Sequence, residues 1–376
     1  MLRLYAVCSV IFLLGNIVNC QSDDENIIEV ETSTPRGRFF PLFSVIRFAN
    51  SQCLASNNLN GTCFTRRECR QYGGTPSGTC ANGHGLCCVF QKTCGATTNV
   101  NNTYFTNPEY PRTYEGQGRC TISVQRCNTN ICQLRLDFLD FTLASPNISG
   151  ICDYDHLLVS GSGSVVPRIC GENANQHVYM DFNDDAPIML SIDTNGDYAT
   201  DRRWNIRIQQ IPCDSPARAP NGCLQYYDTV SNTVTSFNYG TTQNPRAPGT
   251  GTRQMANTNY GVCVRMEQGY CGIEWSQTAM NSFTVSGDTG SLDPSIIGTP
   301  TVAEMGTDCT KDYVIVPHPF VDNTALDTDR FCGNAFVTKT SYSKPFVLYV
   351  VTDGDEITEV DNKGFSLMYR QIPCTI

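Results

Sequence analysis

Residues 205–213 read NIRIQQIPC and residues 366–374 read SLMYRQIPC, so two distant stretches of the chain end in the same four residues. In each stretch, polar and apolar residues alternate before the proline, which is the period of a β-strand with one buried face. A proline and a cysteine then end the strand. The shared ending predicts two copies of one domain, each closed by the same last strand.

The similarity extends towards the N-terminal side of both endings. Arg168-Ile-Cys-Gly171 matches Arg330-Phe-Cys-Gly333, and Cys152-Asp-Tyr-Asp155 matches Cys309-Thr-Lys-Asp312. Three further cysteines keep the same order, as Cys94, Cys120 and Cys132 in one copy and Cys223, Cys263 and Cys271 in the other. Chance similarity between β-strands does not explain this shared order. We therefore predict homologous domains over residues 94–213 and 223–374, joined by a linker over residues 214–222.

Both copies carry β-strand patterns. In the first copy, Leu134, Leu136 and Phe138 alternate with Arg135 and Asp137, which predicts a strand with one apolar face. The apolar set then slips by one residue, to Leu139, Phe141 and Leu143, which indicates a β-bulge or a bend. No long stretch has the 3.6-residue period of an amphipathic helix. We expect an all-β protein built from sandwiches.

The N-terminal part has a different character. Arg3 and the apolar run from Leu4 to Val18 are typical of a secretory signal peptide, which we assign to residues 1–20. This run is short for a membrane span, and no later stretch is long and apolar enough to be one. Residues 21–40 are acidic and then rich in threonine and proline, so we expect a disordered leader. In it, Arg36-Gly-Arg38 is either a protease site or an exposed linker.

Cysteine content and charge restrict the compartment and the partners. The chain has 21 cysteines, which favours an oxidising compartment, and sequons at Asn60, Asn101 and Asn147 offer sites for N-glycosylation. The chain has a net charge of −10 and lacks the clusters of basic residues that nucleic-acid binding requires. We expect a secreted, extracellular protein with no membrane span and no nucleic-acid partner.

Residues 41–90 hold six of the cysteines. This segment is too short to bury a core of its own, so disulfides must stabilise it.

Two resemblances follow from these motifs. Asn107-Pro-Glu-Tyr-Pro-Arg-Thr-Tyr114 resembles the opening of a CUB domain, and Cys152-Asp-Tyr-Asp155 and Ile169-Cys-Gly171 resemble its third and fourth cysteine motifs. The second copy is more divergent and lacks the Pro-x-Tyr-Pro opening. The resemblance implies two antiparallel β-sandwiches of the jelly-roll type. Residues 41–90 resemble a short clip domain, through Gly61-Thr-Cys63 and the Cys87-Cys88 doublet, and the combination looks like secreted insect CUB-domain proteins.

The resemblances imply a set of disulfides. The CUB pattern implies the pairs Cys94–Cys120, Cys152–Cys170, Cys223–Cys263 and Cys309–Cys332. The clip pattern implies the pairs Cys53–Cys87, Cys63–Cys80 and Cys69–Cys88. Each copy has two more cysteines that the CUB pattern does not demand, and because both copies have them we expect the bridges Cys132–Cys213 and Cys271–Cys374. Cys127 has no counterpart in the second copy and is expected to be unpaired. The alternatives are a free thiol, a disulfide-linked dimer through Cys127, or a bond to Cys20 if signal cleavage occurs earlier.

Calcium is the one metal that the sequence suggests. Calcium-binding CUB domains use a Glu before the third cysteine, the Asp of the Cys-x-Tyr-Asp motif and an Asp in the loop before the last strand. These positions point to Asp312, Asp353 and Asp355 in the second copy, and less strongly to Asp155, Asp193 and Asp197 in the first. The Glu position is not acidic in either copy, so any site is expected to be weak, and the residues favour turn-capping aspartates over calcium ligands.

No catalytic constellation stands out. The four histidines are His84, His156, His177 and His318, and no serine lies in the Gly-Asp-Ser-Gly context of clip-associated proteases. The spacing of cysteine and histidine does not match paired zinc knuckles. We therefore expect a non-catalytic extracellular protein that binds protein or glycan partners and needs no cofactor. The alternative is a non-catalytic regulator of a serine-protease cascade, with the clip-like module as its docking element.

Overall fold

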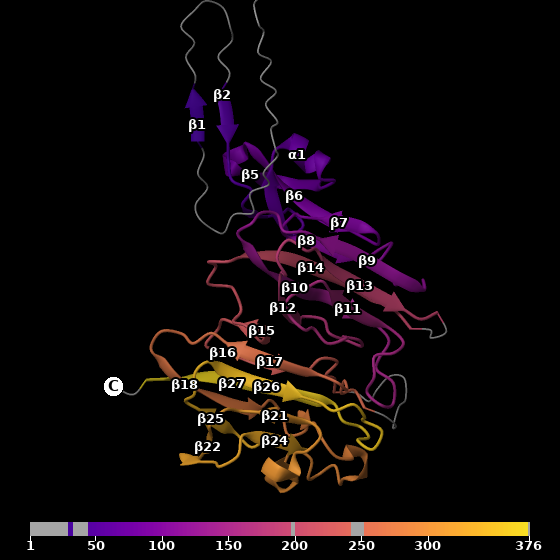
Figure 1. Cartoon of the computed structure of the whole chain (residues 1–376), viewed down its shortest axis with the longest axis vertical. Coiled ribbons are helices and arrows are strands. Elements are labelled where there is room, and N and C mark those ends of the chain that lie inside the picture. Colours follow the sequence, from indigo (N-terminus) through magenta and orange to yellow (C-terminus); the bar gives the residue numbers. More distant parts are fainter. Residues whose placement is uncertain (1–28, 33–43, 197–199, 242–251, 375–376) are drawn as a thin grey trace, which may run out of the picture.

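The computed structural model describes residues 29–32, 44–196, 200–241 and 252–374. In this part of the chain nearly all regular structure is β-strand, and an N-terminal module, a first sandwich and a second sandwich follow one another along the long axis (Figure 1). The expected signal peptide at residues 1–20 and the Arg36-Gly-Arg38 site lie outside the described residues.

The N-terminal module has one short helix, a separate two-stranded sheet of β1 and β2, and strands β3 to β6, which belong to a larger sheet. Its elements are β1 (Glu29–Thr32), β2 (Ser44–Arg47), β3 (Gln52–Leu54), β4 (Asn60–Phe64), α1 (Arg66–Gln71), β5 (Thr75–Cys80), the 3-10 turn η1 (Ala81–Gly83) and β6 (Gly85–Lys92). Helix α1 begins after Thr65, whose hydroxyl accepts the backbone N–H of Glu68, while the Glu68 carboxylate accepts the backbone N–H of Thr65 at 3.0 Å. This reciprocal capping box starts the helix that presents buried Cys69 to the sheet.

One part of the expected leader is ordered. Strand β1 pairs antiparallel with β2, so the prediction of disorder throughout residues 21–40 is wrong at residues 29–32. The sequence of this strand contains Val30 and Thr32, and β-branched residues favour extended backbone. The acidic composition that suggested disorder does not prevent a short strand from pairing with a nearby partner.

The first sandwich consists of two sheets. Its strands are β7 (Ala96–Thr98), β8 (Thr103–Thr106), β9 (Gly118–Val124), β10 (Ile131–Thr142), β11 (His156–Ser160), β12 (His177–Asp181), β13 (Ile188–Thr194) and β14 (Arg203–Pro212). One sheet has the order β11-β13-β9-β7, and the other contains β12-β10-β14-β8. The second of these continues through β6, β4 and β3, because β6 pairs with β8 in parallel. The N-terminal module is therefore joined to the first sandwich by an unbroken sheet.

The predicted bulge lies in β10. Its pairing with β14 is regular from Gln133 to Phe138, which lies opposite Ile206, and then shifts, so that Asp140 lies opposite Asn205. Leu139 is the extra residue, and its side chain is 42% exposed, whereas Phe141 is fully buried. The slip in the sequence pattern was thus a bulge, but Leu139 itself does not join the core.

The second sandwich contains the remaining elements. Its strands are β15 (Cys223–Tyr227), β16 (Ser231–Thr235), β17 (Asn259–Val264), β18 (Tyr270–Gln277), β19 (Phe283–Thr284), β20 (Ala303–Met305), β21 (Tyr313–Ile315), β22 (Pro319–Val321), β23 (Thr324–Ala325), β24 (Arg330–Gly333), β25 (Lys339–Ser341), β26 (Phe346–Val351) and β27 (Gly364–Pro373). Three 3-10 turns are η2 (Thr289–Ser291), η3 (Pro300–Val302) and η4 (Gly306–Asp308). The sheets have the orders β15-β17-β26-β21-β24-β20 and β16-β27-β18-β25-β22-β23, with β19 beside β27.

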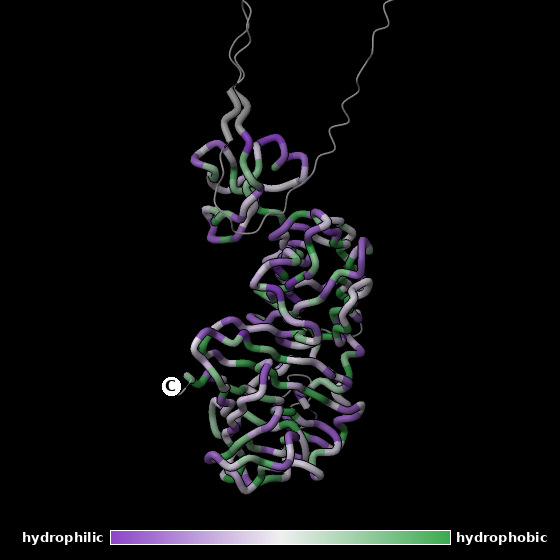
Figure 2. Tube along the Cα trace, turned by 60° about the vertical axis from the view of Figure 1, so that its left-hand side comes forward, coloured by the Kyte–Doolittle hydropathy of each residue, from purple (hydrophilic) through white to green (hydrophobic). Residues whose placement is uncertain are grey.

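The two matching endings of the sequence are the strands β14 and β27. Each lies inside its sheet, β14 between β10 and β8 and β27 between β16 and β18. Each sandwich buries one tryptophan completely, Trp204 in the first and Trp275 in the second. The trace coloured by hydropathy shows hydrophobic and hydrophilic residues interspersed throughout both sandwiches (Figure 2).

The structure joins the nine cysteine pairs expected from the sequence, with S–S distances between 1.96 and 2.16 Å. Cys127 is also disulfide-bonded, so the prediction of an unpaired Cys127 is wrong. Its side chain packs against the apolar cluster around Phe64 and Phe90, where the module meets the first sandwich. The disulfide-linked dimer, one of the three alternatives for Cys127, stays a prediction.

The linker between the sandwiches is held against the first one. Ala219 donates its N–H to Oε1 of Gln133 at 2.8 Å, and Nε2 of Gln133 donates to the carbonyl of Ala219 at 3.1 Å. Beyond the linker, Tyr226 donates its N–H to Nε2 of His177 at 3.0 Å, and the rings of Tyr226 and Tyr179 meet edge to face. The two sandwiches therefore pack against each other through buried contacts.

Candidate metal centre

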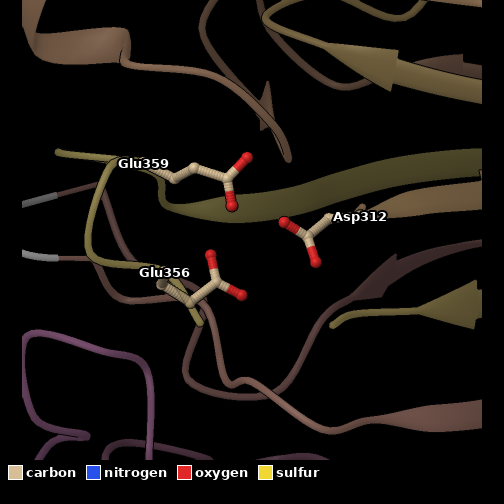
Figure 3. A group of neighbouring side chains, drawn as sticks. All are labelled: Asp312, Glu356 and Glu359. Carbon is tan, nitrogen blue, oxygen red and sulfur yellow. The ribbon is translucent and has the colours of Figure 1, made fainter. Parts of the chain in front are cut away.

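Three acidic side chains converge in the second sandwich. Asp312 lies directly before β21, and Glu356 and Glu359 lie in the loop between β26 and β27 (Figure 3). One carboxylate oxygen from each lies within 4.8 Å of the other two. The residues are only 0%, 0% and 2% exposed, which separates them from ordinary surface acids. We call Asp312, Glu356 and Glu359 the acidic cluster.

Neighbouring groups hold the three carboxylates in place. Asp353 donates its backbone N–H to Oδ1 of Asp312 at 2.7 Å. Oε1 of Glu359 accepts the hydroxyl of Ser286 at 3.1 Å and the N–H of Gly287 at 3.0 Å. The side-chain amide of Gln254 donates to Glu356, with distances of 3.3 and 3.2 Å to its two oxygens. Each side chain is therefore fixed, with part of its bonding capacity left over.

Two carboxylate oxygens of the acidic cluster form no hydrogen bond. They are Oδ2 of Asp312 and Oε2 of Glu359, and both are buried. Among the described residues, no lysine, arginine or histidine forms an ion pair with any of the three acids. Burial and the neighbouring acids raise the pKa of Asp312, and burial together with the charge of Glu359 raises the pKa of Glu356. The cluster thus needs protons or a cation to compensate its charge.

The donor atoms fit a hard divalent cation. All three groups are carboxylates, with no thiolate or imidazole among them, and oxygen-only donors favour Ca²⁺ or Mg²⁺ over Zn²⁺. Two of the oxygens are already desolvated and unpartnered, so a cation would replace no existing hydrogen bond at either. The residues present therefore fit a calcium ion.

The structure brings together only one of the aspartates that the sequence suggested for this copy. Asp312 is in the cluster, but the carboxylate of Asp353 accepts the N–H of Asp355 at 2.9 Å, and that of Asp355 accepts the N–H of Ile357 at 3.0 Å. Asp353 and Asp355 thus cap turns of the loop, and Asp353 donates its backbone N–H to Asp312. The sequence reasoning missed Glu356 and Glu359, although the acid-rich run Asp353-Gly-Asp-Glu-Ile-Thr-Glu359 was a signal for them.

The equivalent position of the first sandwich is already neutralised. Asp155 is buried and accepts the N–H of Asn195 at 3.0 Å, which reproduces the contact between Asp312 and Asp353. Here, however, the guanidinium of Arg202 lies against both carboxylate oxygens, at 2.7 and 3.1 Å. The positive charge of Arg202 therefore neutralises the buried carboxylate of Asp155.

The other two aspartates suggested for the first copy offer no further site. Asp193 is paired with Arg119, at 2.8 and 2.9 Å, and lies near His156. Asp197 lies outside the described residues. The described carboxylates at this position are thus ion-paired with arginine side chains.

The sequons and histidines lie outside the cluster. Asn60, Asn101 and Asn147 are half-exposed, and Nδ2 of Asn147, the atom that would carry a glycan, donates to Asp153 at 2.9 Å. None of the described histidines is a member of the acidic cluster, and His177 serves as an acceptor between the sandwiches.

Comparison with protein families matches both sandwiches. The model of the animal CUB domain matches residues 220–372, and the model of the CUB domain matches residues 94–200. The chain is thus a CUB-domain protein, and it contains two CUB domains. CUB domains mediate extracellular protein interactions and are generally non-catalytic, and many disulfides are typical of extracellular proteins.

Individual relatives match more weakly. The chain is 33% identical over 76 residues to the cubilin homolog of Caenorhabditis elegans, a match that spans 20% of this chain and 2% of that protein. The CUB1-EGF-CUB2 domains of rat MASP-1 are 13% identical with a TM-score of 0.26, over 73% of this chain and 99% of that one. The MASP-1 CUB2 domain bound to Ca²⁺ is 17% identical with a TM-score of 0.26, over 31% of this chain and 98% of that one. Within the described residues, none of the helices combines the length and apolar character needed to cross a membrane.

Proposed function

We propose that this chain is a secreted, non-catalytic binding protein whose second CUB domain binds Ca²⁺ at Asp312, Glu356 and Glu359 and uses the loops around that ion to hold a protein partner. The observation that carries the proposal is the buried acidic cluster with two unpartnered oxygens. Leaving several carboxylates buried without a counter-charge costs several kcal/mol, which a bound cation offsets.

Calcium at this position would order a surface built from both CUB domains. Glu356 donates its N–H to the carbonyl of Ser149 at 3.4 Å, and Ala256 donates its N–H to the carbonyl of Gly150 at 2.9 Å. The loop that carries two of the three acids therefore contacts a loop of the first domain. An ion that fixes one loop also fixes the contact between the two.

The same loops expose apolar side chains. Ile148 and Ile357 are each 53% exposed, and Ile151 is 37% exposed. Exposed isoleucines on two touching loops favour a protein partner, because glycan sites rely on aromatic and hydrogen-bonding side chains rather than branched aliphatic ones. A glycan on Asn147, which adjoins Ile148, would restrict the directions from which such a partner can approach.

Calcium-dependent capture tests this function. We expect the immobilised full chain to retain an extracellular protein in CaCl₂ and to release it in EDTA, and we expect Glu359→Gln or the double variant Ile148→Asp/Ile357→Asp to abolish retention. Asp355→Asn is the matched control, since its carboxylate lies on the same loop but outside the cluster. Retention that survives both EDTA and Glu359→Gln would contradict the proposal.

Regulation of a serine-protease cascade is the second candidate function. The three bridges Cys53–Cys87, Cys63–Cys80 and Cys69–Cys88 of the N-terminal module agree with clip-like pairing, and this supports a docking role for the module. In that role, the chain would be cut after Arg36 or Arg38 when the proteases of its extracellular fluid are activated. Mass spectrometry of the N-terminus before and after activation tests this, and an intact N-terminus would contradict it.

A further inference from the structure

The second CUB domain has an apolar pocket between the edges of its two sheets. Strand β20 forms the edge of one sheet there, and β22, β23 and β25 form the end of the other. The pocket has a volume of about 230 Å³. Its walls are mostly apolar and include Leu326, Val321, Phe331 and Phe336. None of the residues that line it belongs to the acidic cluster.

A buried cation lies in the wall of this pocket. Lys339 is 4% exposed, and its ammonium lies 4.6 Å from the centre of the Phe331 ring and 5.4 Å from that of Phe336. Nζ donates one hydrogen bond, to the carbonyl of Val337 at 2.8 Å. An ammonium has three N–H donors, so the fold leaves part of this group without a strong acceptor.

The charge of Lys339 has no counter-ion among the described residues. Glu304 is the acid that lines the pocket, but it is exposed and forms no ion pair with Lys339. Burial alone lowers the pKa of Lys339 to about 8, so the amine is still mostly protonated at neutral pH. A protonated amine in an apolar wall attracts an anion that can reach it without water.

We propose that this pocket binds a small apolar carboxylate, whose hydrocarbon part fills the space between the sheets and whose carboxylate pairs with the ammonium of Lys339. The volume equals that of about eight liquid water molecules, which suits a hydrocarbon chain of about six to eight carbons. The apolar walls favour the hydrocarbon part of the ligand, and Lys339 favours its charged carboxylate. Neither the acidic cluster nor the loops of the proposed calcium site take part.

Octanoate binding to the full chain tests the proposal. We expect saturable binding of one octanoate per chain by isothermal titration at pH 7, weakened about tenfold or more by Lys339→Met, which keeps the length of the side chain but removes its charge. Lys344→Met is the matched control and should bind octanoate like the unaltered chain, because Lys344 is exposed and does not line the pocket. Octanol, which has no charge, should bind the unaltered chain more weakly than octanoate and should not distinguish it from Lys339→Met.

Three results would overturn the proposal. The first is no binding of octanoate at millimolar concentration, and the second is equal octanoate binding by Lys339→Met and the unaltered chain. The third is octanol binding as tightly as octanoate, which would mean that the pocket binds a neutral apolar group. If Lys339→Met does not fold, Ala303→Phe in the lining of the pocket takes its place. This variant should reduce octanoate binding by filling part of the pocket, and unchanged binding would contradict the site.

Discussion

Asp155 and Asp312 occupy corresponding positions in the two CUB domains, and different neighbouring side chains give them different chemistry. Both accept a backbone N–H from the loop before the last strand. In the first domain the second contact is the guanidinium of Arg202, whereas in the second domain it is Glu356 and Glu359. One domain thus compensates its buried aspartate with its own arginine, and the other needs protons or a bound cation to compensate the charge of its acids.

Replacing Arg202 should destabilise the first domain. Arg202→Met removes the counter-charge of fully buried Asp155, and breaking a buried pair in this way costs about 3–5 kcal/mol. Arg119→Met is the control, because Arg119 is largely exposed and such pairs contribute about 0–1 kcal/mol. Urea denaturation followed by circular dichroism measures both, and equal losses would contradict the account of Asp155.

The stability of the calcium-free chain should fall as pH rises. The folded chain holds the pKa values of Asp312 and Glu356 above their ordinary values, that of Glu356 at about 8, so between about pH 5 and pH 8 the folded state binds more protons than the unfolded state. The stabilisation is therefore present in acid and lost as pH rises through the folded values. In EDTA the urea midpoint should decrease over this range, and Glu356→Gln or added CaCl₂ should reduce the decrease. A midpoint that rises with pH in EDTA as it does in CaCl₂ would count against this.

The candidate site was only partly predictable at the residue scale. Asp312 follows a cysteine in a recognisable motif, so the sequence pointed to it. Glu356 and Glu359 lie in a loop whose conformation places the two glutamates inward and Asp353 and Asp355 on turn N–H groups. Four acids in one short run look alike in sequence, and only the hydrogen bonds of the folded loop distinguish ligands from caps.

At the scale of elements, the bulge of β10 gives a sharp test of register. Leu139 is inserted between Phe138 and Asp140, which pair with the consecutive residues Ile206 and Asn205. Deleting Leu139 should therefore leave the inward and outward faces unchanged and cost no more than about 2 kcal/mol. Deleting Ser123, an outward residue of β9 whose pairing with β13 has no shift, should move Val124 to the wrong face and prevent folding. Secretion yield and urea denaturation measure both, and equal tolerance of the two deletions would contradict this register.

The regular strands were the most predictable elements. Alternation in Leu134-Arg-Leu-Asp-Phe138 and in the two Gln-Ile-Pro-Cys endings comes from burial of one face, which the sequence records directly. The small edge strands β20, β22 and β23 were not predictable, because two or three residues carry no period. The parallel pairing of β6 with β8 was equally hidden, since it depends on how two domains meet rather than on a local pattern.

At the scale of the whole molecule, buried contacts join the two CUB domains. His177 is the clearest of them, because its Nε2 can accept the N–H of Tyr226 only while the ring is neutral. Arg253 of the second domain also pairs with Glu172 of the first at 2.8 Å. We expect the domains to unfold together rather than one after the other.

Acid should weaken this junction through His177. Burial first, and then the charge of Arg135, lower the pKa of His177 to about 4. Between about pH 6.5 and pH 4, His177 is therefore protonated in the unfolded state but mostly neutral in the folded state. In saturating CaCl₂ the chain should lose about 2 kcal/mol more between pH 7 and pH 5 than His177→Gln, which keeps an acceptor but does not titrate. His84→Gln is the control, because His84 is exposed. Indistinguishable pH profiles for the unaltered chain and His177→Gln would refute this role.

Calcium titration of the full chain tests the central claim most directly. Isothermal titration should show one Ca²⁺ bound per chain, with binding lost in Glu359→Gln and in Asp312→Asn but kept in Asp355→Asn, whose carboxylate caps a turn outside the acidic cluster. No heat at millimolar calcium, or equal loss of binding in Asp355→Asn and Glu359→Gln, would contradict the assignment of the site.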